Sequence, residues 1–240
     1  MRLVRPFAIA VAFACLMPAV PGAQMGGDPD RVVPNGGISV AGWQGKIDPG
    51  SVAQGRTIND SKFSQEGSAL HLIIGPAAVY WNPANTASGD YTIKGTFKEP
   101  KMSDANSHPH PYGIFIGGHN MGTDKMSLVY CLAYGDGRAL VRGFNPTAGP
   151  PTGNGHGVFT PMRAAANAAV KKVAAGEPVT QDISWTVKGD SASCTINGTV
   201  VATYTKAELV GADKLESFDG VYGIRISHNV EAVVTGFGKQ

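Results

Sequence analysis

The sequence predicts an all-β protein in which two antiparallel sheets pack face to face, with at most one or two short helices. Many short runs alternate apolar and polar residues, which is the pattern of strands with one buried face. Gly, Pro, Asn and Asp separate these runs, and these residues favour turns. The strands do not alternate with long helices, as a parallel α/β sheet would require.

Individual elements follow from local patterns. In residues 91–98 and 183–188, apolar side chains, Trp185 among them, occupy every second position. Asn197-Gly198 predicts a two-residue hairpin turn because both positions tolerate a positive φ. Thr160 as N-cap, Pro161 at the first helical position and the Ala-rich run 162–175 predict one helix. Further strands are expected at 69–74, 112–117, 193–196, 199–203, 221–227 and 230–237.

The amino terminus predicts export. Arg2 and Arg5 precede an apolar run at 7–17, which is too short for the roughly 20 residues of a membrane-spanning helix. We therefore expect a secreted or periplasmic protein. It would consist of a signal peptide at 1–23, a flexible Gly/Pro/Asp-containing segment at 24–37 and a single β-sandwich domain at 38–240.

The charge balance excludes some partners. Without the leader's two arginines, the eighteen remaining basic residues equal the eighteen acidic ones. No basic run is interleaved with aromatic residues, so nucleic acid and anionic membrane surfaces are poor candidates. There is no second long apolar run and hence no expected membrane span.

The most informative stretch, residues 126–145, reads as a hairpin around Gly135-Asp136-Gly137. This turn pairs Tyr130 with Arg142 and Tyr134 with Arg138 on one face. The opposite face is small and apolar, and it pairs Cys131 with Val141, Ala133 with Ala139 and Val129 with Gly143. The first face is either a ligand-binding surface or cross-strand packing of guanidinium on phenol, and the pattern supports both equally.

Two further residues are candidate ligand contacts. Trp81 follows Tyr80 and precedes Asn82-Pro83, so we expect it to be exposed beside a turn and to offer an aromatic platform. His71 lies on the non-core face of its strand, where it is either a polar group in a cleft or an ordinary surface residue. Aromatic rings beside hydrogen-bonding side chains suit sugars, and the arginines would also suit an anion.

Cys131 and Cys194 remain after the leader is removed. In an oxidising compartment they permit one disulfide, with a single possible connectivity. Both lie in strand-like runs, so two buried free thiols are an equal alternative.

The order of the elements resembles the concanavalin A-like lectin/glucanase sandwich. The resemblance rests on GDYTIKGTF at 89–97, YGIFIGG at 112–118, ISWTVKGDSASCTINGTVV at 183–201 and DGVYGIRISHNVEAVVTGFG at 219–238. In particular, the chain is similar to the secreted bacterial domains of the 3-keto-disaccharide hydrolase type. This resemblance implies a jelly-roll topology and a carbohydrate or glycoconjugate partner.

Catalytic and metal signals are weak. No strand carries the alternating carboxylates with which retaining glucanases flank a glycosidic bond. Asp213, Glu216 and Asp219 match no established calcium loop, and His108 and His110 lack a nearby third ligand. We therefore expect no metal site and no cofactor.

Two functions remain open, and the sequence does not decide whether the protein is an enzyme. The first is an exported, non-catalytic sandwich that binds carbohydrate or another surface partner. The second is a hydrolase acting on an oxidised or simple glycoside, with His119, Asp136 and His228 in acid/base roles.

Overall fold

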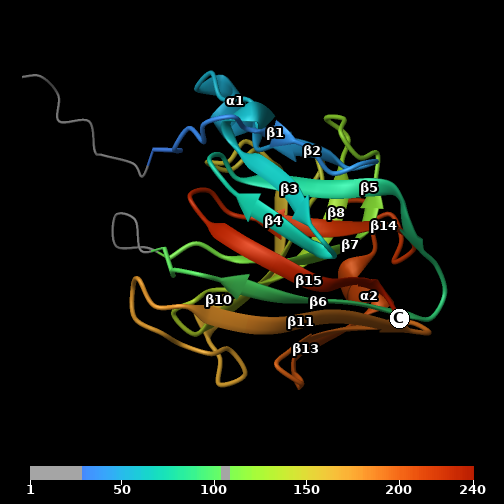
Figure 1. Cartoon of the computed structure of the whole chain (residues 1–240). Coiled ribbons are helices and arrows are strands. Elements are labelled where there is room, and N and C mark those ends of the chain that lie inside the picture. The colour runs from blue at the N-terminus through green and yellow to red at the C-terminus, as the bar shows by residue number, and fades with distance from the viewer. Residues whose placement is uncertain (1–28, 104–108) are drawn as a thin grey trace, which may run out of the picture.

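The protein folds as a two-layer β-sandwich in the computed structural model, which describes residues 29–103 and 109–240. The expected signal peptide and His108 lie outside these residues. One layer has eight strands and the other seven (Figure 1). All strand pairs are antiparallel except β1 with β3. The predicted all-β sandwich is confirmed.

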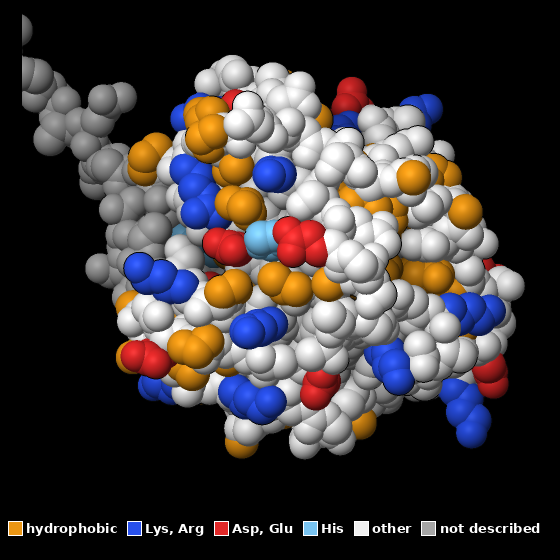
Figure 2. Space-filling view, in the orientation of Figure 1, with side chains coloured by type: hydrophobic (Ala, Val, Ile, Leu, Met, Phe, Trp, Pro, Cys, Tyr) orange, Lys and Arg blue, Asp and Glu red, His pale blue; other side chains and the backbone are white. Residues whose placement is uncertain are grey.

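The eight-stranded sheet lies toward the viewer in Figure 1. In spatial order its strands are β1 (Gly37–Ile38), β3 (Lys62–Glu66), β4 (Ala69–Ile73), β15 (Glu231–Lys239), β6 (Tyr91–Glu99), β11 (Val179–Lys188), β12 (Ser191–Ile196) and β13 (Thr199–Thr205). Its outer face carries scattered side chains of both charges, without a patch of a single sign (Figure 2).

The seven-stranded sheet lies behind it. Its strands, in order, are β10 (Val158–Ala166), β9 (Arg138–Phe144), β8 (Ser127–Ala133), β7 (Tyr112–His119), β14 (Gly220–Ile226), β5 (Ala78–Ala87) and β2 (Gln44–Ile47). The helices in the described residues are short: α1 (Pro49–Ala53), the 3-10 turn η1 (Ile58–Asp60) and α2 (Lys206–Leu209).

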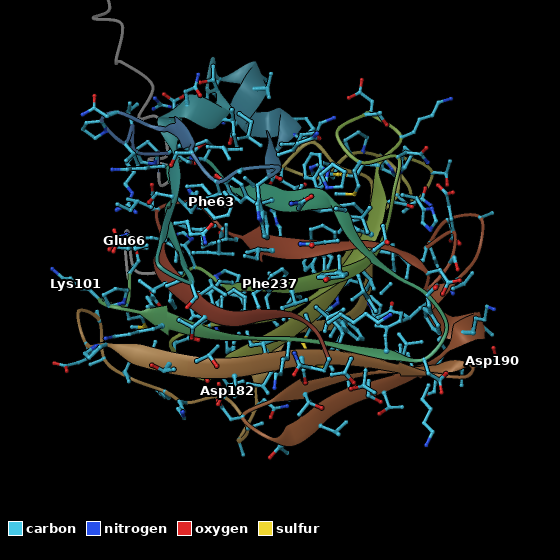
Figure 3. The ribbon with its side chains drawn as sticks, turned by 45° about the vertical axis from the view of Figure 1, so that its right-hand side comes forward. Phe63, Glu66, Lys101, Asp182, Asp190 and Phe237 are labelled. Atoms are coloured by element: carbon cyan, nitrogen blue, oxygen red, sulfur yellow. A yellow bond between two sulfur atoms is a disulfide. The ribbon has the colours of Figure 1, made fainter. Side chains whose placement is uncertain are left out.

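The main core fills the space between the sheets (Figure 3). Phe63 is fully buried there, and its ring contacts Trp43 edge-on at 5.1 Å between ring centroids. Trp185 is also fully buried, as its alternation predicted, and its Nε1 donates to the Ile114 carbonyl at 3.1 Å. This hydrogen bond joins the two sheets and satisfies a polar group that burial would otherwise leave unpaired.

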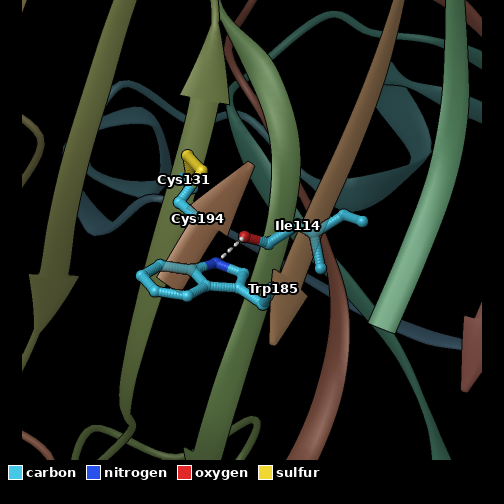
Figure 4. The surroundings of a disulfide bond; sticks show 4 residues. All are labelled: Ile114, Cys131, Trp185 and Cys194. Carbon is cyan, nitrogen blue, oxygen red and sulfur yellow. Dashed lines mark hydrogen bonds between the residues drawn. A yellow bond between two sulfur atoms is a disulfide. The ribbon is translucent and has the colours of Figure 1, made fainter. Parts of the chain in front are cut away.

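A disulfide also joins the two layers. Cys131 of β8 is bonded to Cys194 of β12, and both residues are fully buried beside Trp185 (Figure 4). The structure thus selects the bridge from the two alternatives that the sequence left open.

The hairpin prediction is confirmed in detail. Strands β8 and β9 pair Tyr130 with Arg142 and Cys131 with Val141. Asn197 and Gly198 both have positive φ, of 49° and 80°, between paired β12 and β13. Local turn chemistry and alternation are sufficient to specify both hairpins.

The helix expected at 162–175 is wrong. The first part of that run belongs to β10, the edge strand that pairs with β9 through two register shifts. Pro161 falls at the first of these irregularities, where a missing N–H is tolerated. The alanines from 164 to 166 are exposed, so they provide no apolar stripe with which a helix could pack.

The segment expected to be flexible, 24–37, packs on the sandwich in its described part. Arg31 donates from Nε to the Ile74 carbonyl at 2.8 Å and from Nη2 to the Val230 carbonyl at 2.9 Å. Val33 is buried. The adjacent Asp30 contacts Ser51 of α1 and His228, which follows β14 of the seven-stranded sheet. No helix among the described residues is long and apolar enough to cross a membrane.

Candidate ligand-binding pocket

A pocket of about 340 Å³ lies on the outer face of the seven-stranded sheet. Its apolar lining comes from the central hairpin and includes Tyr130, Leu132, Tyr134 and Leu140. Its volume falls within the roughly 300–1,000 Å³ typical of small-molecule sites.

Two chain segments far apart in sequence cover this face and form the pocket wall. The Gly50 N–H in α1 donates to the Asn154 carbonyl at 2.9 Å. His156, in the same Gly-rich loop as Asn154, stacks on Phe144 of β9 with ring centroids 3.9 Å apart. A second apolar cluster therefore forms on the outer face, and it includes Tyr130 and Phe144.

A buried ion pair supports one side of the pocket. Arg225 projects from β14 to the outer face because its neighbours Ile224 and Ile226 point into the core. Its Nη1 and Nη2 donate to the two oxygens of Asp48, both at 2.7 Å. Asp48 follows β2 directly, and its Oδ1 also lies 3.2 Å from His156 Nε2.

Burial by itself would raise the pKa of Asp48, but the charge and hydrogen bonds of Arg225 and His156 hold that pKa below its usual value. Conversely, burial would lower the pKa of Arg225, and the Asp48 carboxylate keeps it raised. Asp48 is therefore an ionised, bidentately bound carboxylate that cannot donate a proton to a bound ligand at neutral pH.

The second carboxylate of the pocket, Asp30, is also engaged. It lies 2.9 Å from His228 Nδ1 and accepts a hydrogen bond from the Ser51 hydroxyl at 2.6 Å. Burial raises its pKa, but the contributions of His228 and Ser51 outweigh this and leave the pKa lowered. His228 also meets the buried ring of His110 edge-on, at 4.2 Å between centroids.

The hairpin residues have separate surroundings. Tyr130 is 2% exposed, and burial raises its pKa to about 12. Arg138 lies over the Tyr134 ring at 4.3 Å from the ring centroid, and its Nε donates to Asp136 at 2.7 Å. Tyr130, Tyr134 and Arg142 line the pocket, whereas Arg138 does not. The face expected to be open is therefore largely covered, and one Tyr/Arg pair is a packing contact.

The exposure expected for Trp81 is wrong. Trp81 lies within β5 and is only 3% exposed. It shares the outer face with Val79, and Met121 and Met126 pack into the same cluster. The segment 121–126 thus covers a ring that its own sequence neighbourhood suggested would be free.

The remaining candidates lie away from the pocket. His71 is on the eight-stranded sheet, where its Nε2 is 2.9 Å from Glu231 and its Nδ1 is 3.6 Å from Glu66. His119 contacts the Asp219 carbonyl at 2.8 Å and lies 3.8 Å from Glu216. His119 follows Gly118, which pairs with Val221 at the start of β14, whereas His228 lies just after the end of that strand. The two histidines are therefore at opposite ends of β14. In the described part of the chain, no group of three or more His, Cys, Asp or Glu could hold a metal ion.

Comparison with known proteins identifies the architecture. No protein-family model matches the chain, and no curated protein matches it significantly. Carbohydrate-binding module CBM66 from Bacillus subtilis aligns with a TM-score of 0.51 and 8% identity, over 85% of this chain and 99% of the module. A Bacillus subtilis protein of unknown function with a galectin-like fold gives 0.51 and 13%, over 82% and 88%. The fold is a two-sheet jelly-roll sandwich. At these identities the likeness shows the fold alone.

Sequence reasoning missed the ion pair at the pocket. Arg225 stands in the stretch at 219–238, which served above only as a sign of the fold. A charged residue between two inward-facing isoleucines of a central strand was a usable signal. Asp48 and His156 carried no such signal, because the pairing of β2 and β14 with β5 brings Asp48 to Arg225, and the 145–157 loop brings His156 to Asp48.

Proposed function

We propose that this protein is an exported, non-catalytic carbohydrate-binding sandwich whose ligand occupies the outer-face pocket. The observation that carries the proposal is the pocket's composition. Its exposed lining is mostly polar, with Asp30, Arg142 and His228 among the side chains, and Tyr130, Tyr134, Leu132 and Leu140 add apolar surface beside them. This combination suits sugars, which present C–H faces and hydroxyl edges.

The state of the two pocket carboxylates argues for binding without hydrolysis. A glycosidase needs one carboxylic acid to protonate the leaving group and a second carboxylate as nucleophile or base. Asp48 and Asp30 both have lowered pKa values, despite burial, because basic partners and hydrogen bonds stabilise the charged forms. They are therefore unsuited to the role of the general acid.

The fold and the disulfide support the same proposal. A module named for carbohydrate binding shares this architecture, although a shared fold carries no activity by itself. The Cys131–Cys194 disulfide suits an oxidising compartment, which agrees with the export that the amino-terminal sequence predicts.

The test is a glycan-binding screen of the mature protein followed by titration calorimetry. Tyr130→Phe retains the ring but removes the hydroxyl, and we expect a severalfold weaker affinity, in line with the loss of one hydrogen bond. Tyr204→Phe, in β13 of the other sheet, is the matched control and should bind normally. Equal binding by both variants would place the ligand elsewhere.

A second function is favoured by one contact. The Asp30 carboxylate holds the His228 imidazole at 2.9 Å beside the pocket, and a carboxylate-oriented imidazole is a common general base. In this case the protein would be a glycan-active hydrolase. Product formation from a bound glycan, lost in His228→Gln with binding retained, would establish this function in place of the first.

A further inference from the structure

The pocket contains one guanidinium whose charge no described residue balances. Asp48 is matched by Arg225 through two hydrogen bonds of 2.7 Å. Asp30 is held by contacts with the Ser51 hydroxyl at 2.6 Å and with His228 Nδ1 at 2.9 Å. Arg142, the remaining charged residue of the pocket lining, forms no ion pair or side-chain hydrogen bond with any residue that the structure describes.

The position of Arg142 makes this absence notable. It lies in β9, directly across from Tyr130, and retains partial exposure to the pocket. Its Nε is buried, and among the residues described it has no hydrogen-bond partner. A buried donor without a partner is costly, more so when it is charged, and is rare in native proteins.

The other arginine of the hairpin provides an internal comparison. Arg138 lies on the same face of β9, but its Nε donates to Asp136 at 2.7 Å and its guanidinium stacks on Tyr134. Cross-strand packing therefore accounts for Arg138 and leaves Arg142 unexplained. The hairpin sequence supported cross-strand packing and ligand binding equally. The structure assigns packing to the Tyr134–Arg138 pair and leaves Arg142 as the candidate for ligand binding.

We propose that the pocket selects acidic saccharides, and that Arg142 binds the carboxylate of a uronic acid residue. This inference rests on the proposed carbohydrate-binding function. The planar guanidinium fork matches a carboxylate with two parallel hydrogen bonds. Tyr134, which lines the pocket and is only half-buried, provides aromatic surface for the sugar ring, whereas Tyr130, directly across from Arg142, is almost fully buried at the same pocket.

The experiment compares oligogalacturonate with the same oligosaccharide as its methyl ester and with a neutral galacto-oligosaccharide, by calorimetry with the mature protein. We expect at least tenfold tighter binding of the free acid and a loss of affinity as salt increases. Arg142→Gln should weaken binding of the acid about ten- to hundredfold and leave the neutral sugar within about twofold.

Two variants serve as controls. Arg142→Lys keeps the charge but loses the fork, and it should fall between wild type and Arg142→Gln. Arg163→Gln removes an exposed arginine from β10 and should bind as wild type does. Circular dichroism of each variant verifies that the fold is retained.

The outcomes separate this inference from the function on which it rests. Binding of the neutral sugar or ester as tight as that of the acid, or an acid affinity unchanged in Arg142→Gln, overturns the acidic preference while carbohydrate binding stands. A mature protein that binds none of the saccharides, in this panel or in the broader screen, overturns both. Inorganic sulfate is titrated in the same way as a simple anion. An affinity for sulfate equal to that for oligogalacturonate overturns the assignment to a uronate.

Discussion

Glu99 gives the sharpest prediction because it is a fully buried carboxyl group away from the pocket. It ends β6, and its side chain points inward like that of Phe97, two residues earlier. Oε1 accepts the Ser103 N–H at 2.7 Å, and the buried hydroxyl of Tyr112 interacts with the same carboxyl group. Burial raises the pKa of Glu99 to about 7, even though hydrogen bonds from the Ser103 N–H and the Tyr112 hydroxyl oppose the increase.

The sign of the pH effect follows from the two protonation states. In the unfolded chain the carboxyl group has its ordinary pKa of 4.5. Between pH 4.5 and about 7 the native protein therefore binds more protons than the unfolded chain, so the free energy of unfolding falls as the pH rises. Above about pH 7 the native protein bears the full free-energy cost of holding a charged carboxylate in its interior. Each pH unit between the two pKa values contributes about 1.4 kcal/mol, so this cost is about 3 kcal/mol.

Glu99→Gln should remove this penalty because the amide keeps the shape of the side chain without the charge. The variant should match wild type near pH 4.5 and exceed its free energy of unfolding by up to about 3 kcal/mol at pH 8. The neighbouring Tyr112 stays neutral over this pH range, since burial, the charge of Glu99 and the hydrogen bond with Glu99 raise its pKa well above the ordinary value.

Urea unfolding of wild type and variant at pH 5, 6, 7 and 8 measures the effect. Glu177→Gln is the control, because Glu177 is exposed and its replacement should not change the pH profile. A difference between Glu99→Gln and wild type that stays constant from pH 5 to pH 8 would show that Glu99 is ionised in the native protein and would refute the reasoning.

Two further predictions concern the supports of the sandwich and the pocket. The variant Cys131→Ala/Cys194→Ala opens a link between residues 63 apart in sequence and should lose about 2–4 kcal/mol of unfolding free energy in non-reducing urea titrations; an unchanged midpoint would contradict this. Arg225→Met leaves the buried Asp48 charge without its partner and should lower the free energy of unfolding by about 3–5 kcal/mol. Adding Asp48→Asn should restore part of this loss, whereas additive losses in the double variant would argue against a coupled pair.

Many elements of the fold were predictable because they depend on neighbours in sequence. Alternation identified β6 and β11, and the turns at Gly135–Gly137 and Asn197-Gly198 specified the register of two hairpins. The helix expected at 162–175 failed because alanine content reflects intrinsic propensity, whereas pairing with β9 supplied the stronger interaction. The exposure of Trp81 failed because a covering segment is invisible to local pattern.

The sequence by itself determined the all-β class, the central hairpin and its Tyr130–Arg142 pairing, because side-chain alternation and turn chemistry act over a few residues. The tertiary structure decided which of those residues meet a pocket and which only pack. Asp48 and Arg225 are 177 residues apart, and only the packing of α1 and the 145–157 loop on the seven-stranded sheet encloses them. That long-range packing also separates Arg138, which is paired within its own turn, from Arg142, which is left facing the pocket.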